Sequence, residues 1–440
     1  MNARERITSR IADQARRYPD FDLSSLDVSG LDDRDAALAR AMEMTTLRRW
    51  LTLVTILDNK LAQPWEGLQP AVKAPLLVGA AQLLLLEKIP DHAAINEAVN
   101  WTKRHARARA GGLVNAILRR VAELRQEVVE KHDPSRADEL ALHDGRAWRL
   151  KENVFDEDPV TRIAQQTSHP RSLIQRWIVA FGRDQAESLA YHNLMQPPII
   201  ISGVDEDSAQ AQTSLLPHEK PGYFLFTGTH VQLTTLLASR EGKNVRVQDP
   251  TTAEPVQATH LMNPHTIIDL CAGLGTKTGQ LAAKHPDARV ITTDKNPARF
   301  EILQRTFDTH RNVEVVPFDR IREFDNQADL LLLDVPCSNS GVLARRVEAK
   351  YRFTGETLEN LVGLQRQIIA DSLPLLSENG RILYTTCSVE EDENQRQVEW
   401  LTHWHPLKVV SSALRMPSGV PGDPVDRYTD GGFHALLERI

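Results

Sequence analysis

The stretch Thr266-Ile267-Ile268-Asp269-Leu270-Cys271-Ala272-Gly273-Leu274-Gly275-Thr276-Lys277-Thr278 decides the fold of this chain. Its β-branched first part, residues 266–270, predicts a short strand, and residues 278–284 predict a helix. Between them lies a glycine-rich turn, where the backbone can approach a ligand closely and the start of the helix offers free amide groups. The stretch therefore predicts the opening strand, turn and helix of an α/β domain, with a ligand site at the turn.

Three more strands are predicted downstream, and each is followed by an aspartate. Residues 289–293 lead to Asp294, residues 313–317 to Asp319, and the apolar run 329–333 to Asp334. Strands that alternate with helices are typical of a parallel, doubly wound sheet. Asp294 occupies the place where such a fold positions a carboxylate to accept hydrogen bonds from a ribose. The fold class is thus α/β, with a Rossmann-like domain.

The ligand expected at this turn is S-adenosylmethionine. The turn lacks both the Gly-x-Gly-x-x-Gly pattern and a phosphate loop, and by itself it is also compatible with a purely structural turn. Carboxylates at three strand ends favour a cofactor with ribose hydroxyls and a cationic centre over NAD or ATP. The predicted cofactor-binding residues are Cys271, Ala272, Gly273, Leu274, Gly275, Thr276, Lys277, Asp294, Asp319 and Asp334.

Two cysteines follow predicted strands of the same domain. Cys337 lies in Asp334-Val335-Pro336-Cys337-Ser338, and Cys387 in Tyr384-Thr385-Thr386-Cys387-Ser388. A thiol at a strand end beside a cofactor turn suits covalent attack on a substrate ring, although free cysteine is most often a small buried hydrophobe. For Cys271, inside the turn, we expect that packing or backbone role.

Composition places the chain among globular proteins of two or three domains. It has 440 residues, 41% hydrophobic and 25% charged, with a net charge of −7, which argues against a protein that coats nucleic acid over its whole surface. The first twenty residues do not resemble a secretory signal, and the longest apolar run, 76–86, is too short to span a bilayer. Three widely spaced cysteines predict no metal site and no disulfide framework. We expect a cytoplasmic monomer without a membrane partner.

The periodicity divides the chain into four parts. Residues 1–132 are predicted to be helical, with one helix at 36–61 and another over 113–129, and residues 133–165 to form a polar linker. A small mixed α/β subdomain is predicted at 166–245, with a helix near 171–190 and a strand at 197–201. The α/β domain with the cofactor turn then occupies residues 246–440.

Basic residues gather in two places and suggest contacts with RNA phosphates. The window 98–122 contains no acidic residue, and a second cluster follows Cys337. Both are also compatible with an ordinary solvated helix face. The predicted RNA-binding residues are Lys103, Arg104, Arg107, Arg109, Arg119 and Arg120 in the window, and Arg345, Arg346 and Lys350, with Arg352 beside them, in the cluster.

Taken together, these motifs resemble a known family. The turn, the Pro336-Cys337-Ser338 and Thr386-Cys387-Ser388 motifs and the closing Asp430-Gly431-Gly432-Phe433-His434-Ala435 resemble RNA cytosine-5 methyltransferases of the Sun/RsmB and Nop2 type. Residues 89–99 and 114–120 resemble the NusB-like helical domain that is fused to the Sun/RsmB branch. The resemblance covers nearly the whole chain and is weakest over residues 133–167 and 205–219.

The resemblance implies roles for individual residues. Cys387 would be the nucleophile that adds to carbon 6 of a cytosine, Cys337 would help to resolve the adduct, and Asp334 would hydrogen-bond the polar edge of the base. The chain departs from the usual Ala-Ala-Pro-Gly-Gly turn, because Gly273, Leu274 and Thr276 replace an alanine, a proline and a glycine. Cofactor affinity is the property that these departures affect.

The expected function is methylation of carbon 5 of a cytosine in RNA, with small-subunit ribosomal RNA as the expected substrate. One alternative is a transfer-RNA cytosine-5 methyltransferase, whose usual form lacks the helical domain. The other is a non-catalytic RNA-binding or ribosome-assembly factor that keeps the fold without using the cofactor.

Overall fold

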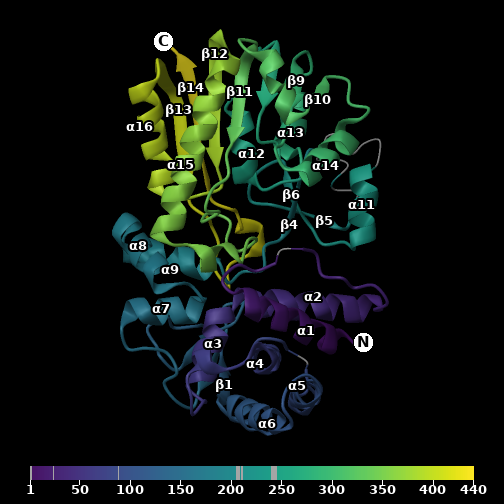
Figure 1. Cartoon of the computed structure of the whole chain (residues 1–440), viewed down its shortest axis with the longest axis vertical. Helices are drawn as coiled ribbons and strands as arrows, with labels where there is room; N and C mark the ends of the chain where they lie inside the picture. Colours follow the sequence, from purple (N-terminus) through teal and green to yellow (C-terminus); the bar gives the residue numbers. More distant parts are fainter. Residues whose placement is uncertain (1, 23, 88, 205–208, 210–211, 239–244) are drawn as a thin grey trace. The chain divides into compact units, whose positions relative to one another are not determined.

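The computed structural model describes residues 2–22, 24–87, 89–204, 209, 212–238 and 245–440 (Figure 1). The chain forms two compact units. Unit 1 consists of residues 1–196, 343–354 and 420–423, and unit 2 of residues 197–342, 355–419 and 424–440. Among the described residues, no helix has both the length and the apolar character needed to cross a bilayer.

Unit 2 is built on a seven-stranded sheet of order β10-β9-β8-β11-β12-β14-β13. The first five strands in this order are parallel, β14 is antiparallel to β12, and β13 is antiparallel to β14. The chain leaves β8 toward β9 on one side and returns to β11 on the other, so the order reverses at β8, which is the point where doubly wound folds bind ligands. The α/β fold predicted from the sequence is confirmed. The strands are β8 (Thr266–Asp269), β9 (Arg289–Thr292), β10 (Val313–Val315), β11 (Ala328–Asp334), β12 (Leu376–Thr386), β13 (Leu407–Arg415) and β14 (Gly432–Arg439).

Helices cover both faces of this sheet because successive side chains of a strand point to opposite faces. In β11, Leu330 and Leu332 pack in the cluster that contains α12 (Pro250–Gln257) and α13 (Thr276–Lys284). Leu331 and Leu333 pack in the cluster that contains α15 (Gly355–Ser372) and α16 (Gln395–Trp404). All four leucines are fully buried, and each contributes about 1.5–3 kcal/mol to stability. This two-sided burial explains why β11 is an unbroken apolar run.

A second, antiparallel sheet lies at the start of unit 2. Its strand order is β5-β6-β4-β7, and its core contains Ile201, Leu215 and Phe224. Three of its strands, β4, β5 and β6, fall within the predicted 166–245 subdomain, of which residues 205–208, 210–211 and 239–244 lie outside the described residues, and β7 follows directly after it. The elements are β4 (Ile199–Ser202), β5 (Leu215–Pro217), β6 (Tyr223–Phe226), α11 (His230–Ala238) and β7 (Arg246–Val247); the remaining elements of unit 2 are α14 (Pro297–Phe307), η3 (Phe318–Phe324), η5 (Leu373–Leu375), η6 (Glu391–Glu393) and η7 (Val425–Arg427).

Unit 1 is mainly helical and packs around α4 (Pro70–Leu84). Residues Leu76 to Leu84 of α4 are all buried, as expected for a helix that is apolar on every side. A three-stranded antiparallel sheet of order β1-β3-β2 completes the unit. Its other elements are α1 (Ala3–Arg17), α2 (Asp33–Arg48), α3 (Trp50–Asp58), η1 (Trp65–Gly67), α5 (Asp91–His105), α6 (Ala108–Glu123), β1 (Arg125–Val129), β2 (Glu139–Ala141), β3 (Ala147–Leu150), α7 (Pro159–Thr167), α8 (Arg171–Phe181), α9 (Arg183–His192) and η4 (Ala349–Arg352).

The structure differs from the sequence-based expectation at three places in unit 1. The helix expected at 36–61 is interrupted at Arg49, which is buried and donates a hydrogen bond to the carbonyl of Ala141 (2.9 Å). The helix expected near 171–190 is two helices, because Gly182 has a φ of +79°. The interval expected to be a linker contains β2 and β3, and residues 125–129, expected to be helical, form β1. The break at Arg49 and the small sheet depend on contacts between segments far apart in the sequence, whereas the break at Gly182 is local.

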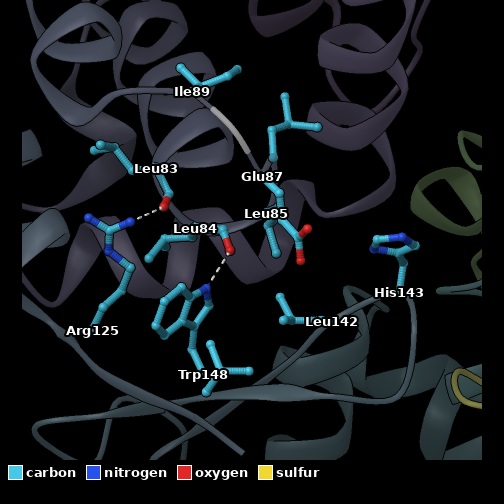
Figure 2. Close-up of a pocket in the computed structure, with 11 residues that line it drawn as sticks. Leu83, Leu84, Leu85, Glu87, Ile89, Arg125, Leu142, His143 and Trp148 are labelled. Atoms are coloured by element: carbon cyan, nitrogen blue, oxygen red, sulfur yellow. Dashed lines mark hydrogen bonds between the residues drawn. The ribbon is translucent and has the colours of Figure 1, made fainter. Parts of the chain in front are cut away.

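A cavity of about 260 Å³ lies in unit 1 beside the end of α4 (Figure 2). Trp148 donates a hydrogen bond to the carbonyl of Leu84 and Arg125 donates one to the carbonyl of Leu83, so the small sheet is tied to this helix end. The walls are mostly apolar, with His143 at one side. The cavity contains no thiol, and its Glu87 is paired with Arg146, so we assign it no part in the chemistry considered below.

Candidate active site

The glycine turn joins β8 to α13 at the point where the strand order reverses. Gly275 caps α13 with a φ of +87°, a conformation that favours glycine. A Cβ atom at this position would lie 2.5 Å from a ring carbon of Phe307. Gly273 also has a positive φ, +60°, but a Cβ there would meet no atom within 4 Å. The turn is therefore held in a tight form in which the first amides of α13 remain available to a ligand.

Asp294 connects this turn to the end of β9. One of its carboxylate oxygens accepts a hydrogen bond from the backbone N–H of Gly273 (2.9 Å), and the other accepts one from the N–H of Asn296 (2.8 Å). The side chain is 8% exposed. A carboxylate held in this way can also accept hydrogen bonds from hydroxyl groups of a ligand, because each oxygen has two lone pairs.

Asp269 supports the turn from beneath. It is fully buried at the end of β8, where the hydroxyl of Thr278 donates a 2.6 Å hydrogen bond to Oδ2. Within the described part of the chain, its Oδ1 and the buried Oγ1 of Thr293 have no hydrogen-bond partner. Burial raises the pKa of Asp269 to about 7, against the lowering effect of the Thr278 hydrogen bond.

Lys277 and Asp334 form an ion pair at the same edge of the sheet. Nζ of Lys277, in the first turn of α13, lies 2.8 Å from a carboxylate oxygen of Asp334 at the end of β11. Burial by itself lowers the pKa of Lys277, but the charge of Asp334 and the hydrogen bond to it outweigh burial and raise this pKa. The pair gives the site a fixed cation and a partly exposed carboxylate beside the thiols.

The two cysteine loops meet at this edge because β11 and β12 are parallel neighbours, with Asp334 opposite Thr385. The Sγ atoms of Cys337 and Cys387 are 3.1 Å apart, and both cysteines are free thiols. The thiol of Cys387 also donates a hydrogen bond to Oδ1 of Asn339 (3.2 Å). The hydrogen bond between the thiols, together with burial, raises the pKa of Cys337 well above its ordinary value. Two free thiols therefore lie next to each other at this edge of the sheet.

A small hollow opens beside Cys387. It is bordered by the end of β12, the start of β14 and the first turn of α12. Lys277, Cys387 and His434 are among its lining residues, and the backbone of Gly431 and Gly432 forms part of its wall. The nucleophile candidate therefore lies at the edge of a small hollow next to the ion pair.

Not every predicted site residue lies in this cluster. Cys271 is within the turn, and burial raises its pKa, which agrees with the expected packing role. Leu274 is 60% exposed at the tip of the turn. Asp319 is exposed in the first turn of η3, after β10. Lys277 and Asp334, by contrast, are brought into direct contact.

The predicted RNA-binding residues belong to unit 1, and one of them has to be corrected. Lys350 is 1% exposed, and its ammonium donates hydrogen bonds to the carbonyls of Arg48 (2.9 Å) and Thr167 (3.4 Å). It therefore has a structural role and cannot contact a phosphate from this position. Within the described part of unit 1, the exposed members of the predicted set are Lys103, Arg104, Arg107, Arg109, Arg119, Arg120 and Arg346, and Arg345 is half-buried.

Sequence reasoning missed the residues that hold the cysteine loops. Asn339 has a φ of +61°, and its Nδ2 donates a hydrogen bond to the carbonyl of Cys337 (3.0 Å). Glu393, the last residue of η6, contacts the Cys337 loop, and Asn394, just before α16, contacts the Cys387 loop. The only local signal is that a serine follows each cysteine, at Ser338 and Ser388.

These features define a class of protein. A doubly wound sheet of order β10-β9-β8-β11-β12-β14-β13, a glycine turn at the reversal point and acidic strand ends indicate an α/β methyltransferase fold rather than a phosphate-binding one. The turn also fits S-adenosylmethionine. Gly275 leaves no room for a side chain, Asp294 is placed for ribose hydroxyls, and the partly exposed Asp334 provides negative charge near a sulfonium.

Two family models match different parts of the chain. Residues 256–419 match the model described as 16S rRNA methyltransferase RsmB/F, and residues 5–123 match the NusB family. Residues 256–419 are thus similar to RsmB/F-type methyltransferases, and residues 5–123 to NusB-family domains. S-adenosylmethionine is the cofactor of this site.

Individual relatives agree with this assignment over most of the chain. A ribosomal RNA small subunit methyltransferase B of Xanthomonas campestris pv. campestris is 26% identical and covers 99% of this chain and 96% of the relative. A probable ribosomal RNA small subunit methyltransferase B of Bacillus subtilis is 25% identical and covers 90% of this chain and 86% of the relative. The crystal structure of PH0851 has the same fold, with a TM-score of 0.70, 19% identity and coverage of 99% of this chain and 98% of that chain.

Proposed function

We propose that this protein methylates carbon 5 of a cytosine in small-subunit ribosomal RNA through a covalent adduct on Cys387. The observation that carries the proposal is the 3.1 Å approach of two free thiols beside the Lys277–Asp334 pair. A thiolate is needed because carbon 5 of cytosine is too weakly nucleophilic to accept a methyl group unaided. Ribosomal RNA is chosen as the substrate because the relatives are named as ribosomal RNA small subunit methyltransferases.

The chemistry follows from the arrangement of the residues. The thiolate of Cys387 adds to carbon 6, and the electron pair of the C5–C6 bond makes carbon 5 a nucleophile. When bound, S-adenosylmethionine would supply the electrophilic methyl group for carbon 5, and the electron pair of the broken sulfur–methyl bond would leave with the sulfur of S-adenosylhomocysteine. A base then removes the carbon 5 proton, the electrons re-form the C5–C6 bond, and the Sγ–C6 bond breaks to release Cys387. Asp334 accepts a hydrogen bond from the polar edge of the base, and Lys277 stabilises negative charge beside it.

Cys337 is placed to act in the release step. Its Sγ lies 3.1 Å from that of Cys387, and the hydrogen bond to this thiol, together with burial, raises the pKa of Cys337. It can therefore assist the release of product without competing for carbon 6. RNA reaches the site in single-stranded form or with the target base out of its stack. Phosphates are held by exposed basic side chains such as Lys103, Arg107 and Arg346.

The test separates the two thiols. Cys387→Ala should abolish both methylation and any RNA adduct that resists denaturant. Cys337→Ala should slow release, so that a protein–RNA conjugate accumulates and migrates as a shifted band on a denaturing gel. The double variant is the matched control and should give no conjugate. Loss of the conjugate in Cys337→Ala with retention in Cys387→Ala would exchange the roles, and methylation that survives in both single variants would exclude covalent catalysis.

Two further measurements, the choice of RNA substrate and the binding of S-adenosylmethionine, decide between the alternatives. Methylation of transfer-RNA transcripts in preference to small-subunit ribosomal RNA would indicate a transfer-RNA enzyme. A non-catalytic assembly factor would bind RNA but show no heat of binding with millimolar S-adenosylmethionine in calorimetry, and neither cysteine variant would form a conjugate.

A further inference from the structure

Two adjacent residues of unit 2, Glu393 and Asn394, contact the loops that carry the two thiols. Both are 0% exposed. Their hydrogen bonds go to residues that flank Cys337 and Cys387, and neither belongs to the turn that receives the cofactor. Burying a carboxylate and an amide side by side costs free energy unless every polar atom finds a partner. The partners that these side chains have found are the cysteine loops.

Glu393 holds the Cys337 loop through the residue that follows the cysteine. Its Oε1 accepts hydrogen bonds from the backbone N–H of Ser338 (2.9 Å) and from Nε2 of Gln365 (2.9 Å). Its Oε2 accepts a 2.5 Å hydrogen bond from the hydroxyl of Ser338. Gln365 also donates to the carbonyl of Pro336 (2.9 Å), which precedes Cys337. The carboxylate thus fixes the backbone on one side of Cys337 directly and on the other side through Gln365.

Asn394 holds the Cys387 loop from both sides of the cysteine. Its Oδ1 accepts a 2.6 Å hydrogen bond from the hydroxyl of Thr386, and its Nδ2 donates one of 2.9 Å to the carbonyl of Ser388. The loops are also joined to each other, because the hydroxyls of Ser338 and Ser388 are 3.1 Å apart. Because Glu393 and Asn394 are consecutive residues, one peptide bond links the side chain that holds the Cys337 loop to the side chain that holds the Cys387 loop.

We infer that Glu393 and Asn394 are positioning residues that set the distance between the two thiols, with Glu393 serving the thiol of the release step and Asn394 serving the nucleophile. The assignment of a step to each residue rests on the proposed function, whereas the setting of the distance does not. Glu393 has an electrostatic effect as well. Its negative charge adds to the hydrogen bond and burial that raise the pKa of Cys337, so it helps to keep this thiol protonated.

The first experiment measures the thiol distance without RNA or cofactor. Diamide, a two-electron thiol oxidant, converts two adjacent thiols into a disulfide, and closure requires an S–S separation of about 2.05 Å. Glu393→Ala and Asn394→Ala should slow closure about 10- to 100-fold, the scale of a displacement near 1 Å. Glu393→Gln should close at nearly the wild-type rate, because its Oε1 keeps two donors and its Nε2 can donate to the Ser338 hydroxyl. Glu391→Ala, which alters an exposed carboxylate of the same segment, is the matched control and should also close normally.

The second experiment uses the conjugate on a denaturing gel. Glu393→Ala should accumulate conjugate as Cys337→Ala does, whereas Asn394→Ala should form conjugate at least about tenfold more slowly than wild type. A merely structural role would reduce conjugate and methylation together in both variants, in parallel with a lowered thermal transition. If the alanine variants do not fold, Glu393→Asp and Asn394→Asp carry the test, since Glu393→Asp shortens the side chain that reaches Ser338 and Gln365, and Asn394→Asp keeps the Thr386 contact and loses the donor to Ser388.

The outcomes distinguish this inference from the proposed function. Normal disulfide closure in both alanine variants, while Cys337→Ala still accumulates conjugate, would overturn the positioning role and leave the proposed function standing. Slow closure in both variants, with no conjugate from any cysteine variant, would support the control of thiol distance and overturn the catalytic assignments. Opposite changes in conjugate for the two neighbouring residues would support the whole inference.

Discussion

At the scale of single residues, the site depends on how burial changes the character of ordinary side chains. Lys350 belongs to a basic cluster in the sequence, yet its ammonium is bound to the carbonyls of Arg48 and Thr167 inside unit 1. Burial lowers the pKa of Lys350 well below its usual value, and the charges of Arg48 and Arg49 act in the same direction. Asp269 shows the opposite case of an acid whose pKa is raised by burial. Residue type alone therefore does not predict charge or role here.

Asp294 gives a prediction at this scale. Asp294→Ala should weaken S-adenosylmethionine binding by about 1–3 kcal/mol, the scale of a missing charge-assisted hydrogen bond. Part of the effect should come from the turn, because Gly273 loses its acceptor. Calorimetric titration measures the affinity, and Asp287→Ala, at an exposed position before β9, should bind as the wild type does. Unchanged affinity in Asp294→Ala, with an intact thermal transition, would contradict the ribose-binding assignment.

At the scale of an element, the junction between β8 and α13 determines whether the cofactor turn can form. The two glycines of the turn both have positive φ, but their surroundings differ. Gly275 faces the ring of Phe307 on α14, whereas Gly273 faces open space. Position 275 thus requires glycine both for its positive φ and for the lack of space, whereas position 273 requires it for its positive φ alone.

Because the two glycines differ in the space around them, adding one methyl group to each should lower stability by different amounts. Gly273→Ala should cost about 1–2 kcal/mol, the free energy that a left-handed conformation requires of an L-residue. Gly275→Ala should cost more and should also weaken the cofactor, because the new Cβ would push α13 and α14 apart. Chemical denaturation gives the stability and calorimetry gives the affinity. Equal losses of stability in the two variants would show that packing against Phe307 has no part in shaping the turn.

At the scale of the whole molecule, the question is how a protein with a negative net charge can bind RNA, which is also negatively charged. The net charge is −7, so RNA binding depends on local basic surfaces rather than on overall charge. The side chains of Lys103 in α5, Arg109 in α6 and Arg107 between the two helices are exposed, while Arg104 is 3.1 Å from the carboxylate of Glu5. This face of unit 1 is the strongest candidate for a phosphate track.

Neutralising this face should change the salt dependence of binding. The triple change of Arg104, Arg107 and Arg109 to Ala should weaken RNA binding and lower the slope of log K against log salt by about 0.7–0.9 for each phosphate that is no longer neutralised. Cofactor affinity should not change. The triple change of Arg305, Arg320 and Arg322 to Ala is a matched control, because these arginines of unit 2 are already paired with Glu301, Glu323 and Asp325. An identical slope in the two triple variants would show that the α5–α6 face is an ordinary solvated surface that does not contact RNA phosphates.

The sequence by itself determined the features that are encoded locally. The strand–turn–helix around Gly273 and Gly275, the apolar run of β11 and the cysteine at each strand end follow from periodicity and short motifs, because each depends on neighbouring residues. The resemblance to a methyltransferase family rested on the same motifs and was confirmed by the family matches.

Only the tertiary structure decided which of these residues meet. The approach of Cys337 to Cys387 follows from the pairing of β11 with β12. The hydrogen bonds that Glu393 and Asn394 make to the cysteine loops also join segments that are separate in the sequence. The burial of Lys350 and the break at Arg49 likewise arise from bonds to segments far away in the chain. Such contacts leave no periodic trace, because their free energy comes from groups that are brought together only when the chain folds.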